Sequence, residues 1–323
     1  MQIKGNERLS FIKRDKKKLK NFSRPFKLSR PFLLAVLVLT ILLTAGSHAA
    51  EITAKAAIAI DSSTSEILYA KNPDLKLPPA STTKLITAMV ALDTLNPDDI
   101  VTISRRAADT QSIQPKLKTG EKVSVQNLLD LALMRSINGA AVALAEAAAG
   151  SERSFVQLMN EKAKTLGAAN TKFINASGLP GKGQYTTARD LATIMKSALT
   201  YPVLSGIIDT RIKALEVDGK TVMLTNTNNL LWSNEDHLGG KTGYTRAARH
   251  CFVGASEKEE GTLIIALLGD SSRDTLWTDA EKLLAKDFQK GTIIIDARED
   301  GLRVKRHKAA HRTKSKRSKT KSL

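Results

Sequence analysis

The stretch PPASTTKLITAMVALDTL, from Pro78 to Leu95, marks where the chain changes from strands to a helix. Its two prolines end any strand before them, because proline cannot donate a hydrogen bond to a β-ladder. The apolar residues that follow recur at helical spacing, at Leu85, Ile86, Met89, Val90 and Leu92. This pattern predicts that Ser81 lies at or near the start of a helix that enters the core.

The segments around this helix predict a mixed fold. Before it, Ala54–Tyr69 contains two apolar or alternating runs around an Asp-Ser-Ser-Thr turn, which indicates a hairpin. After it come Ala- and Leu-rich helical patterns at Val125–Met134, Gly139–Ala149, Ser154–Leu166 and Thr187–Leu199. Short runs then predict antiparallel strands at Ile212–Glu216, Thr221–Leu224, Gly239–Tyr244, Cys251–Ala255 and Thr262–Leu268. A last helix is predicted at Arg273–Phe288.

This order predicts the α+β class, an antiparallel sheet flanked by helices with a helical block inserted between the two halves of the sheet. We expect one folded body over residues 51–297, between a basic leader at 1–50 and a basic tail at 298–323. The net charge of +18 comes from the ends, because Met1–Arg30 carries +9 and Leu302–Leu323 carries +10. A nucleic-acid-binding body would itself carry basic residues, so no nucleic-acid partner is expected.

The leader contains an uncharged apolar run, PFLLAVLVLTILLTAG, from Pro31 to Gly46. It follows the basic stretch and precedes the small residues Ser47 and Ala49, a layout typical of a secretory signal. The alternative is an uncleaved anchor in the inner membrane, for which about 20 apolar residues span a bilayer comfortably. In both cases we expect the body to be exported, to the periplasm or the cell envelope.

The tail KRHKAAHRTKSKRSKTKSL, Lys305–Leu323, has no apolar face and is predicted to be disordered. It serves either as a solubilising segment or as a contact to an anionic surface, formed by membrane lipid headgroups or acidic wall polymer. The sequence leaves both alternatives open.

Several kinds of catalytic site are disfavoured. The chain lacks the G-x-S-x-G, H-E-x-x-H, P-loop and dinucleotide-binding patterns. His237 and His250 are the only histidines of the body, and Cys251 is the single cysteine. This argues against a Ser-His-Asp triad, a zinc site and a disulfide. We therefore expect no metal and no other cofactor, and a nucleophile whose base is not histidine.

The motif Ser81-Thr82-Thr83-Lys84 supplies another kind of base. Residues three apart in a helix share a face, so the lysine amine can reach the serine hydroxyl. A buried lysine beside other cationic groups has a lowered pKa and can accept the serine proton. S-x-x-K recurs at Ser10 and Ser318, but both lie in the lysine-rich ends, outside any helical pattern.

Two further motifs occur downstream. Ser136-Ile137-Asn138 falls between two predicted helices, where a helix-capping pair is the alternative interpretation. Lys241-Thr242-Gly243 lies on a predicted strand, and a glycine there allows a ligand backbone to approach closely. A second K-T-G, Lys118–Gly120, lies in a polar turn, where a lysine followed closely by glycine is common. It is interpreted as an ordinary turn.

The order S-x-x-K, S-x-N, K-T-G, with gaps of 55 and 105 residues, is far more specific than any one motif. The chain resembles the penicillin-recognising serine acyltransferases, which include penicillin-binding proteins and class A β-lactamases. Within that group it is similar to low-molecular-mass D-alanyl-D-alanine carboxypeptidases and endopeptidases. The resemblance covers roughly residues 54–290, including LLDLALMRSINGAA, TTARDLATIM and KTGYTRAA. It implies the helix-flanked antiparallel sheet of that superfamily.

The resemblance also implies how the reaction proceeds. Ser81 would attack the carbonyl between two D-alanines, with Lys84 as its general base. Ser136 and Asn138 would relay a proton and hold the substrate amide. Water would then release the acyl-enzyme.

The K-T-G strand would hold the substrate by the same resemblance. Lys241 would set the local positive potential, and Thr242 would bind the terminal carboxylate. Gly243 and Tyr244 continue this substrate-binding strand. The backbone N–H groups of Tyr244 and Ser81 would form the oxyanion hole.

The expected activity is removal of the terminal D-Ala from peptidoglycan stem pentapeptides, with β-lactams as covalent inhibitors. An endopeptidase that cleaves peptidoglycan crosslinks with the same site is the alternative. Carboxypeptidases of this family often carry a second β-rich domain, and the roughly 30 residues that follow the body here also fit the endopeptidase type. A β-lactamase is disfavoured, since no glutamate precedes an asparagine by four residues between Asn138 and Lys241. A non-catalytic penicillin-binding or wall-binding module would be expected to have a broken motif, and all three are intact.

One position departs from the resemblance. Arg249 stands where the family usually has glycine, and a bulky cation there would narrow the cleft or add a contact to a carboxylate. The neighbouring Cys251 is interpreted as a small buried strand residue.

Removing Leu302–Leu323 should leave turnover of small soluble peptides unchanged, because the tail lies outside the predicted body. Association with sacculi or anionic vesicles should weaken, and the difference from the full chain should shrink as salt screens the tail. Sedimentation with either surface at low and high salt measures this. Equal binding by both chains at low salt would contradict the charge-contact alternative.

Overall fold

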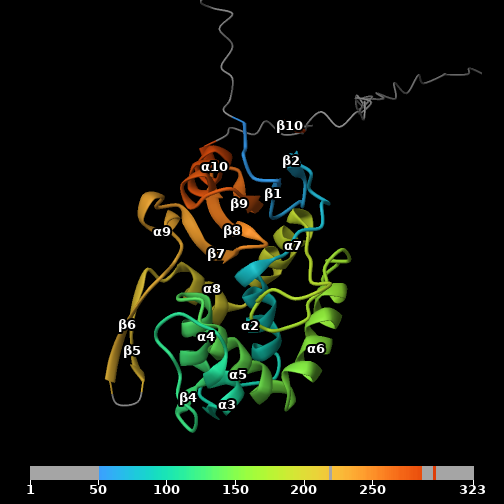
Figure 1. The fold of residues 1–323 in the computed structure, drawn as a ribbon. Coiled ribbons are helices and arrows are strands. Elements are labelled where there is room, and N and C mark those ends of the chain that lie inside the picture. Colours follow the sequence, from blue (N-terminus) through green and yellow to red (C-terminus); the bar gives the residue numbers. More distant parts are fainter. Residues whose placement is uncertain (1–50, 218–219, 286–293, 296–323) are drawn as a thin grey trace, which may run out of the picture. The chain divides into compact units, whose positions relative to one another are not determined.

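The computed structural model describes residues 51–217, 220–285 and 294–295. The predicted leader, the predicted tail and the end of the last predicted helix lie outside these residues. Over the described body, strands and helices follow the predicted order of hairpin, helices, strands and helix (Figure 1).

The main sheet has six strands in the order β10-β2-β1-β9-β8-β7 (Figure 1). Their bounds are β1 Ala56–Asp61, β2 Ile67–Lys71, β7 His237–Thr245, β8 Arg249–Lys258, β9 Gly261–Asp270 and β10 Ile294–Ile295. All neighbours pair antiparallel except β10, which runs parallel to β2. The chain thus brings its first hairpin beside its last strands, and β1 pairs directly with β9.

The sheet is covered on both faces, which explains why its strands are continuous apolar runs. Alternate residues point to opposite faces, so Ala56 and Ile58 join the large core while Ala57 and Ala59 join the core under α10 (Arg273–Ala285). Figure 1 shows α10 on one side of the sheet and α7 on the other.

The opposite face is covered by α7 (Ala188–Ala198), which packs on β1 and β9, and α8 (Pro202–Asp209), which packs on β7. The predicted helix over Thr187–Leu199 corresponds to α7, which ends at Ala198. The sequence did not predict α8, which Pro202 begins, since a proline at the first helical position loses no intrahelical hydrogen bond. No single helix of the described residues is long and apolar enough to cross a membrane. Within the part of the chain that the structure describes, α7 and α8 together reach that length and composition, with a bend of 110° between them.

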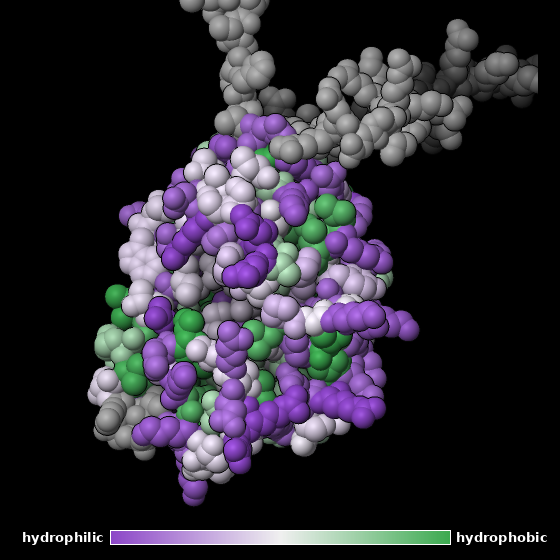
Figure 2. Space-filling model, viewed as in Figure 1, coloured by the Kyte–Doolittle hydropathy of each residue, from purple (hydrophilic) through white to green (hydrophobic). Residues whose placement is uncertain are grey.

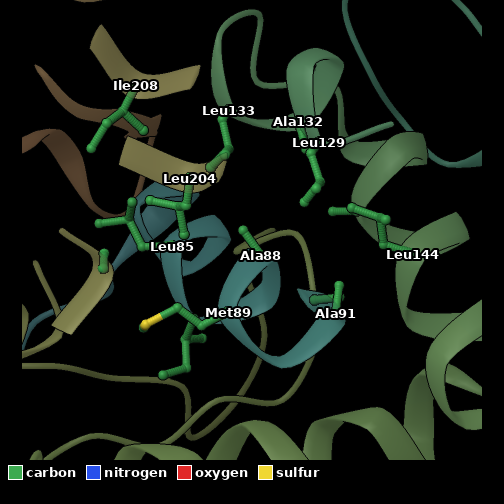
Figure 3. Packing of buried hydrophobic residues seen from close by; sticks show 14 of the residues in the cluster. Leu85, Ala88, Met89, Ala91, Leu129, Ala132, Leu133, Leu144, Leu204 and Ile208 are labelled. Carbon is green, nitrogen blue, oxygen red and sulfur yellow. The ribbon is translucent and has the colours of Figure 1, made fainter. Parts of the chain in front are cut away.

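The helical block surrounds η3 (Ala80–Thr83) and α2 (Lys84–Leu92). Around them lie α3 Arg105–Asp109, α4 Val125–Leu133, α5 Asn138–Ala149 and α6 Glu152–Thr165. In Figure 3, Leu85 of α2 lies beside Leu204, while Ala88 and Ala91 face the side on which Leu129 and Leu144 lie. The predicted helix is therefore the central element of the core.

Two pairs of strands stand apart from the main sheet. One is β3 (Ile100–Thr102) with β4 (Lys122–Ser124), and the other is the hairpin of β5 (Ile212–Val217) and β6 (Lys220–Thr225). The sequence correctly predicted β5 and β6 as strands, but they pair only with each other. They alternate in burial, because Leu215 and Leu224 are buried whereas Ile212 and Met223 are exposed. A hairpin with one buried and one exposed face cannot take a place inside a sheet whose two faces are both covered. Figure 2 shows hydrophobic side chains gathered on the surface at this hairpin.

The close contact between η3 and the loop after Phe173 depends on Gly178. Its φ is +81°, a conformation that L-residues adopt at a cost. A Cβ at this position would lie 1.8 Å from the carbonyl oxygen of Ala80. Glycine therefore lets this loop approach the segment that carries Ser81.

Gly178→Ala should lower the free energy of unfolding by about 3 kcal/mol, since left-handed strain adds to a clash with the Ala80 carbonyl. Gly183→Ala is the matched control, because its φ is +87° but no heavy atom lies within 4 Å of its Cβ position. It should lose only about 1 to 2 kcal/mol from the left-handed strain. Urea denaturation of both variants measures the difference, and equal losses would show that the contact with Ala80 contributes nothing.

Candidate active site

The three sequence motifs meet at one cleft of about 390 Å³. Ser81 comes from η3, Ser136 from the turn between α4 and α5, and Thr242 and Gly243 from β7. Among the described strands, β7 lies at the end of the sheet with β8 as its one neighbour, and its other side contacts η3. The other lining residues are Ile113, Asn138, Thr227, Tyr244, His250, Arg273, Leu276 and Trp277.

The hydroxyl of Ser81 and the amine of Lys84 lie together, with Oγ and Nζ 2.8 Å apart. The helix start explains this contact. Residues 80–83 form a 3₁₀ turn, in which side chains three apart eclipse one another, and the α-helix follows at Lys84. The predicted pairing on one helix face is therefore present in the structure.

Lys84 is fully buried and its amine has two further partners. Nζ donates to Asn138 Oδ1 over 2.7 Å and to the carbonyl oxygen of Ser177 over 2.6 Å. Burial holds the pKa of Lys84 well below its usual value, and the cation of Lys241 lowers this pKa further. The amine is thus placed in surroundings that favour its neutral form.

Ser136 has a strained backbone, with φ of +64° in a residue other than glycine. Its hydroxyl accepts a hydrogen bond from Lys241 Nζ over 3.2 Å. The alternative capping interpretation is wrong, because Ile137 is the cap of α5 and no side chain caps that helix. Ser136 lines the cleft, where its hydroxyl meets Lys241 of β7.

Lys241 is buried, and its Nζ also donates to the carbonyl of Thr242 over 3.0 Å. Burial lowers the pKa of Lys241 to about 7, so near neutral pH both charge states are populated. Gly243 lets β7 approach η3, since a Cβ on it would lie 2.9 Å from the backbone nitrogen of Ser81. Tyr244 is 56% exposed, and its ring lies against His250 with centroids 4.5 Å apart.

Thr227 is a cleft residue that the sequence analysis missed. Its Oγ1 lies 2.6 Å from Oγ1 of Thr242, so it orients the hydroxyl of the K-T-G threonine. The next residue, Asn228, contacts the buried ring of His237, which also bonds Ser256. Burial lowers the pKa of His237 to about 4, so the His237 imidazole that supports Asn228 stays neutral at pH 7. No motif in the polar stretch TNTNN distinguishes Thr227 from its neighbours.

Arg249 has φ of +60°, the conformation that favours glycine at this position. Its guanidinium donates to the carbonyl of Ser271 over 2.8 Å and is directed to the loop before α10. The cleft-lining residues include His250 but not Arg249. The side chain therefore leaves the cleft open, contrary to the expectation that it would narrow it. Cys251 is fully buried, and burial raises its pKa to about 12.

The family model of D-alanyl-D-alanine carboxypeptidases matches residues 44–272. The chain belongs to this family. The fold comparison agrees: a D-alanyl-D-alanine carboxypeptidase from Mycobacterium tuberculosis superimposes with a TM-score of 0.69 and 33% identity, over 72% of this chain and 90% of that one. A Streptomyces DD-transpeptidase gives a TM-score of 0.69 at 31% identity, over 72% of this chain and 96% of that one.

Two relatives represent the two predicted activities. D-alanyl-D-alanine carboxypeptidase DacF of Bacillus subtilis is 35% identical over 243 residues, which are 73% of this chain and 62% of that protein. A D-alanyl-D-alanine endopeptidase of Escherichia coli is 32% identical over 268 residues, which are 81% of this chain and 86% of that protein. The predicted family, fold class and hydrolase class are confirmed. The identities do not separate carboxypeptidase from endopeptidase.

Lys241→Met should raise the pKa of Lys84, because it removes the cation whose repulsion disfavours protonation of the Lys84 amine. An NMR titration of protein labelled with ¹³C at lysine Cε measures this directly. Lys196→Met is the control, since Lys196 bonds Ser65 at the surface and should not affect Lys84. An unchanged Lys84 titration in Lys241→Met would show that the two lysines are not electrostatically coupled.

Proposed function

We propose that this protein is a serine D-alanyl-D-alanine carboxypeptidase that removes the terminal D-Ala from peptidoglycan stem pentapeptides through an acyl-enzyme on Ser81. The observation that carries the proposal is the buried amine of Lys84, 2.8 Å from Ser81 Oγ. A neutral amine has two N–H groups and one lone pair. With the N–H groups donated to Asn138 and Ser177, the lone pair is left for the Ser81 hydroxyl.

In the first step the Ser81 proton passes to Lys84 while Oγ bonds to the carbonyl carbon between the two D-alanines. The N–H groups of Ser81 and Tyr244 stabilise the oxyanion, a contribution of roughly 3 to 4 kcal/mol per donor. The N–H of Ser81 is at the start of a helix, where such groups have no helical partner. The C–N bond then breaks, and D-Ala leaves with the proton that Lys84 returns through Ser136.

The substrate carboxylate would be bound by Thr242, and Lys241 would set the local positive potential. Because the pKa of Lys241 is lowered to about 7, an approaching carboxylate would favour its charged form and raise that pKa. The contact with Thr227 orients the Thr242 hydroxyl toward the ligand. Asn138 holds the substrate amide while its Oδ1 remains on Lys84.

Water releases the acyl-enzyme in the last step. None of the described residues that line the cleft is an aspartate or a glutamate. No carboxylate of these lining residues can activate the water that would attack a β-lactam acyl group. This acyl group should therefore be hydrolysed slowly, which makes β-lactams covalent inhibitors.

An endopeptidase that cleaves peptidoglycan crosslinks is the second candidate. It is supported by the Escherichia coli endopeptidase, of which the match covers 86%, and by a Pseudomonas aeruginosa endopeptidase at 34% identity. Both reactions use a D-alanyl carbonyl and the same nucleophile, and they differ in the size of the leaving group.

We further propose that the protein acts outside the cytoplasm, in the periplasm or cell envelope. The apolar run Pro31–Gly46 after a basic leader supports export, with the leader either removed or retained as an anchor. The basic tail Leu302–Leu323 would add contact to an anionic membrane or wall polymer.

The full-length chain should release D-alanine from a peptide ending in D-Ala-D-Ala and form a covalent adduct with a β-lactam, both visible by mass spectrometry. Ser81→Ala should abolish both, because no other hydroxyl contacts the Lys84 amine among the described residues. Ser63→Ala, an exposed turn serine, is the control.

Crosslinked muropeptide dimers are tested in parallel. Cleavage of dimers with the pentapeptide spared would assign the endopeptidase activity instead. Labelling that persists in Ser81→Ala would refute the nucleophile, and binding of β-lactam without any product would indicate a non-catalytic module.

A further inference from the structure

The carbonyl of Ser177 that holds Lys84 is itself fixed through its neighbour Ala176. The Ala176 N–H donates to Oε1 of Glu152 over 2.9 Å, and the Ala176 carbonyl accepts from Thr87 over 2.7 Å. Both backbone polar groups of Ala176 are thus tied to helices α6 and α2. The Ser177 carbonyl belongs to the peptide unit whose Gly178 N–H donates to Asn175 Oδ1 over 2.7 Å, so it has little freedom to turn away from Lys84.

The other acceptor, Asn138 Oδ1, is fixed by the segment after α3. Asn138 Nδ2 donates to the Gln111 carbonyl over 2.7 Å, and its backbone N–H donates to Ser112 Oγ over 2.9 Å. These contacts determine which end of the amide faces Lys84. The segment is tied back to α3, because the Thr110 hydroxyl donates to the carbonyl of Arg106 over 2.7 Å.

An ion pair joins these two supports. Arg106 Nη2 and Glu152 Oε2 lie 2.5 Å apart, with the Glu152 side chain 9% exposed and the Arg106 side chain 65% exposed. A nearly buried carboxylate is costly unless it is paired, so Glu152 holds Arg106 in place. The connection runs from the Ser177 loop through Glu152 and Arg106 to the segment that orients Asn138.

We infer that the Arg106–Glu152 ion pair positions Lys84. The ion pair keeps Asn138 Oδ1 and the Ser177 carbonyl, which accept from the Lys84 amine, in place, so that the lone pair of Lys84 faces Ser81. The inference rests on the proposed function, in which that lone pair accepts the Ser81 proton. Among the described residues, Lys241 on β7 is the charged group that acts on Lys84, while Ser81, Asn138 and Ser177 meet it with neutral groups. The ion pair therefore acts through geometry rather than through direct charge on Lys84.

The test compares Arg106→Gln and Glu152→Gln with Arg105→Gln in the full chain. Glu152→Gln keeps an oxygen for Ala176 while losing the charge, and Arg106→Gln removes the charge of a side chain that is 65% exposed. Arg105 is the matched control, because it lies on the same helix in an exposed pair with Asp109. Arg106→Lys keeps the positive charge and tests whether the charge alone restores the acylation rate.

Two measurements distinguish a role in positioning Lys84 from an effect on the stability of the fold alone. Acylation by a fluorescent penicillin should be about tenfold slower in Arg106→Gln and Glu152→Gln, because a small misplacement of a catalytic group is costly. In the ¹³C titration the pKa of Lys84 should rise in both, since a loosened site admits water and relieves desolvation. Arg105→Gln should match the unaltered chain in both readouts, and Arg106→Lys should recover most of the rate.

Variants that lose thermal stability but acylate and titrate like the unaltered chain would overturn the inference, since they would show a structural role only. If the unaltered chain is not acylated, the proposed function fails instead. The titration still decides the inference in that case: a raised Lys84 pKa in both variants supports it, and an unchanged pKa overturns it.

Discussion

The burial of one lysine amine is the constraint on which the rest of this structure depends. Lys84 lies in the core, and no carboxylate of the described residues pairs its charge. Its partners there are a hydroxyl, an amide oxygen and a backbone carbonyl. Such surroundings disfavour the ammonium form and favour a neutral base. The arrangement costs stability, and the large apolar core around α2 offsets that cost.

The remaining architecture serves to bring groups to that amine from distant parts of the chain. The sheet pairs β1 with β9 and ends at β7, whose outer side contacts η3. The helical block supplies Ser136 and Asn138 at the turn between α4 and α5. Because both layers pack on the same short segment, a single cleft contains all three motifs.

Much of the precision of the site comes from residues outside the three sequence motifs. Thr242 is oriented by Thr227, whose segment is held by a neutral, buried His237. The acceptors of Lys84 are held by Glu152 and by the segment after α3. These supports use neutral or fully paired groups, which add no unpaired charge near Lys84. The one departure from the family pattern, Arg249, is directed to the loop before α10 and not into the cleft.

The sequence by itself determined the element order, the family and the pairing of Ser81 with Lys84, because these depend on local spacing. A three-residue interval fixes which side chains share a helix face, and long apolar runs reveal strands buried on both faces. It did not reveal that β5 and β6 leave the main sheet, because a strand pattern does not identify its partner. Only the tertiary structure decided that Lys241 reaches Ser136 across 105 residues, and that the Ser177 carbonyl and Thr227 belong to the site. The physical reason is that every residue has a carbonyl and many have a hydroxyl, so only packing selects the few that meet the buried amine.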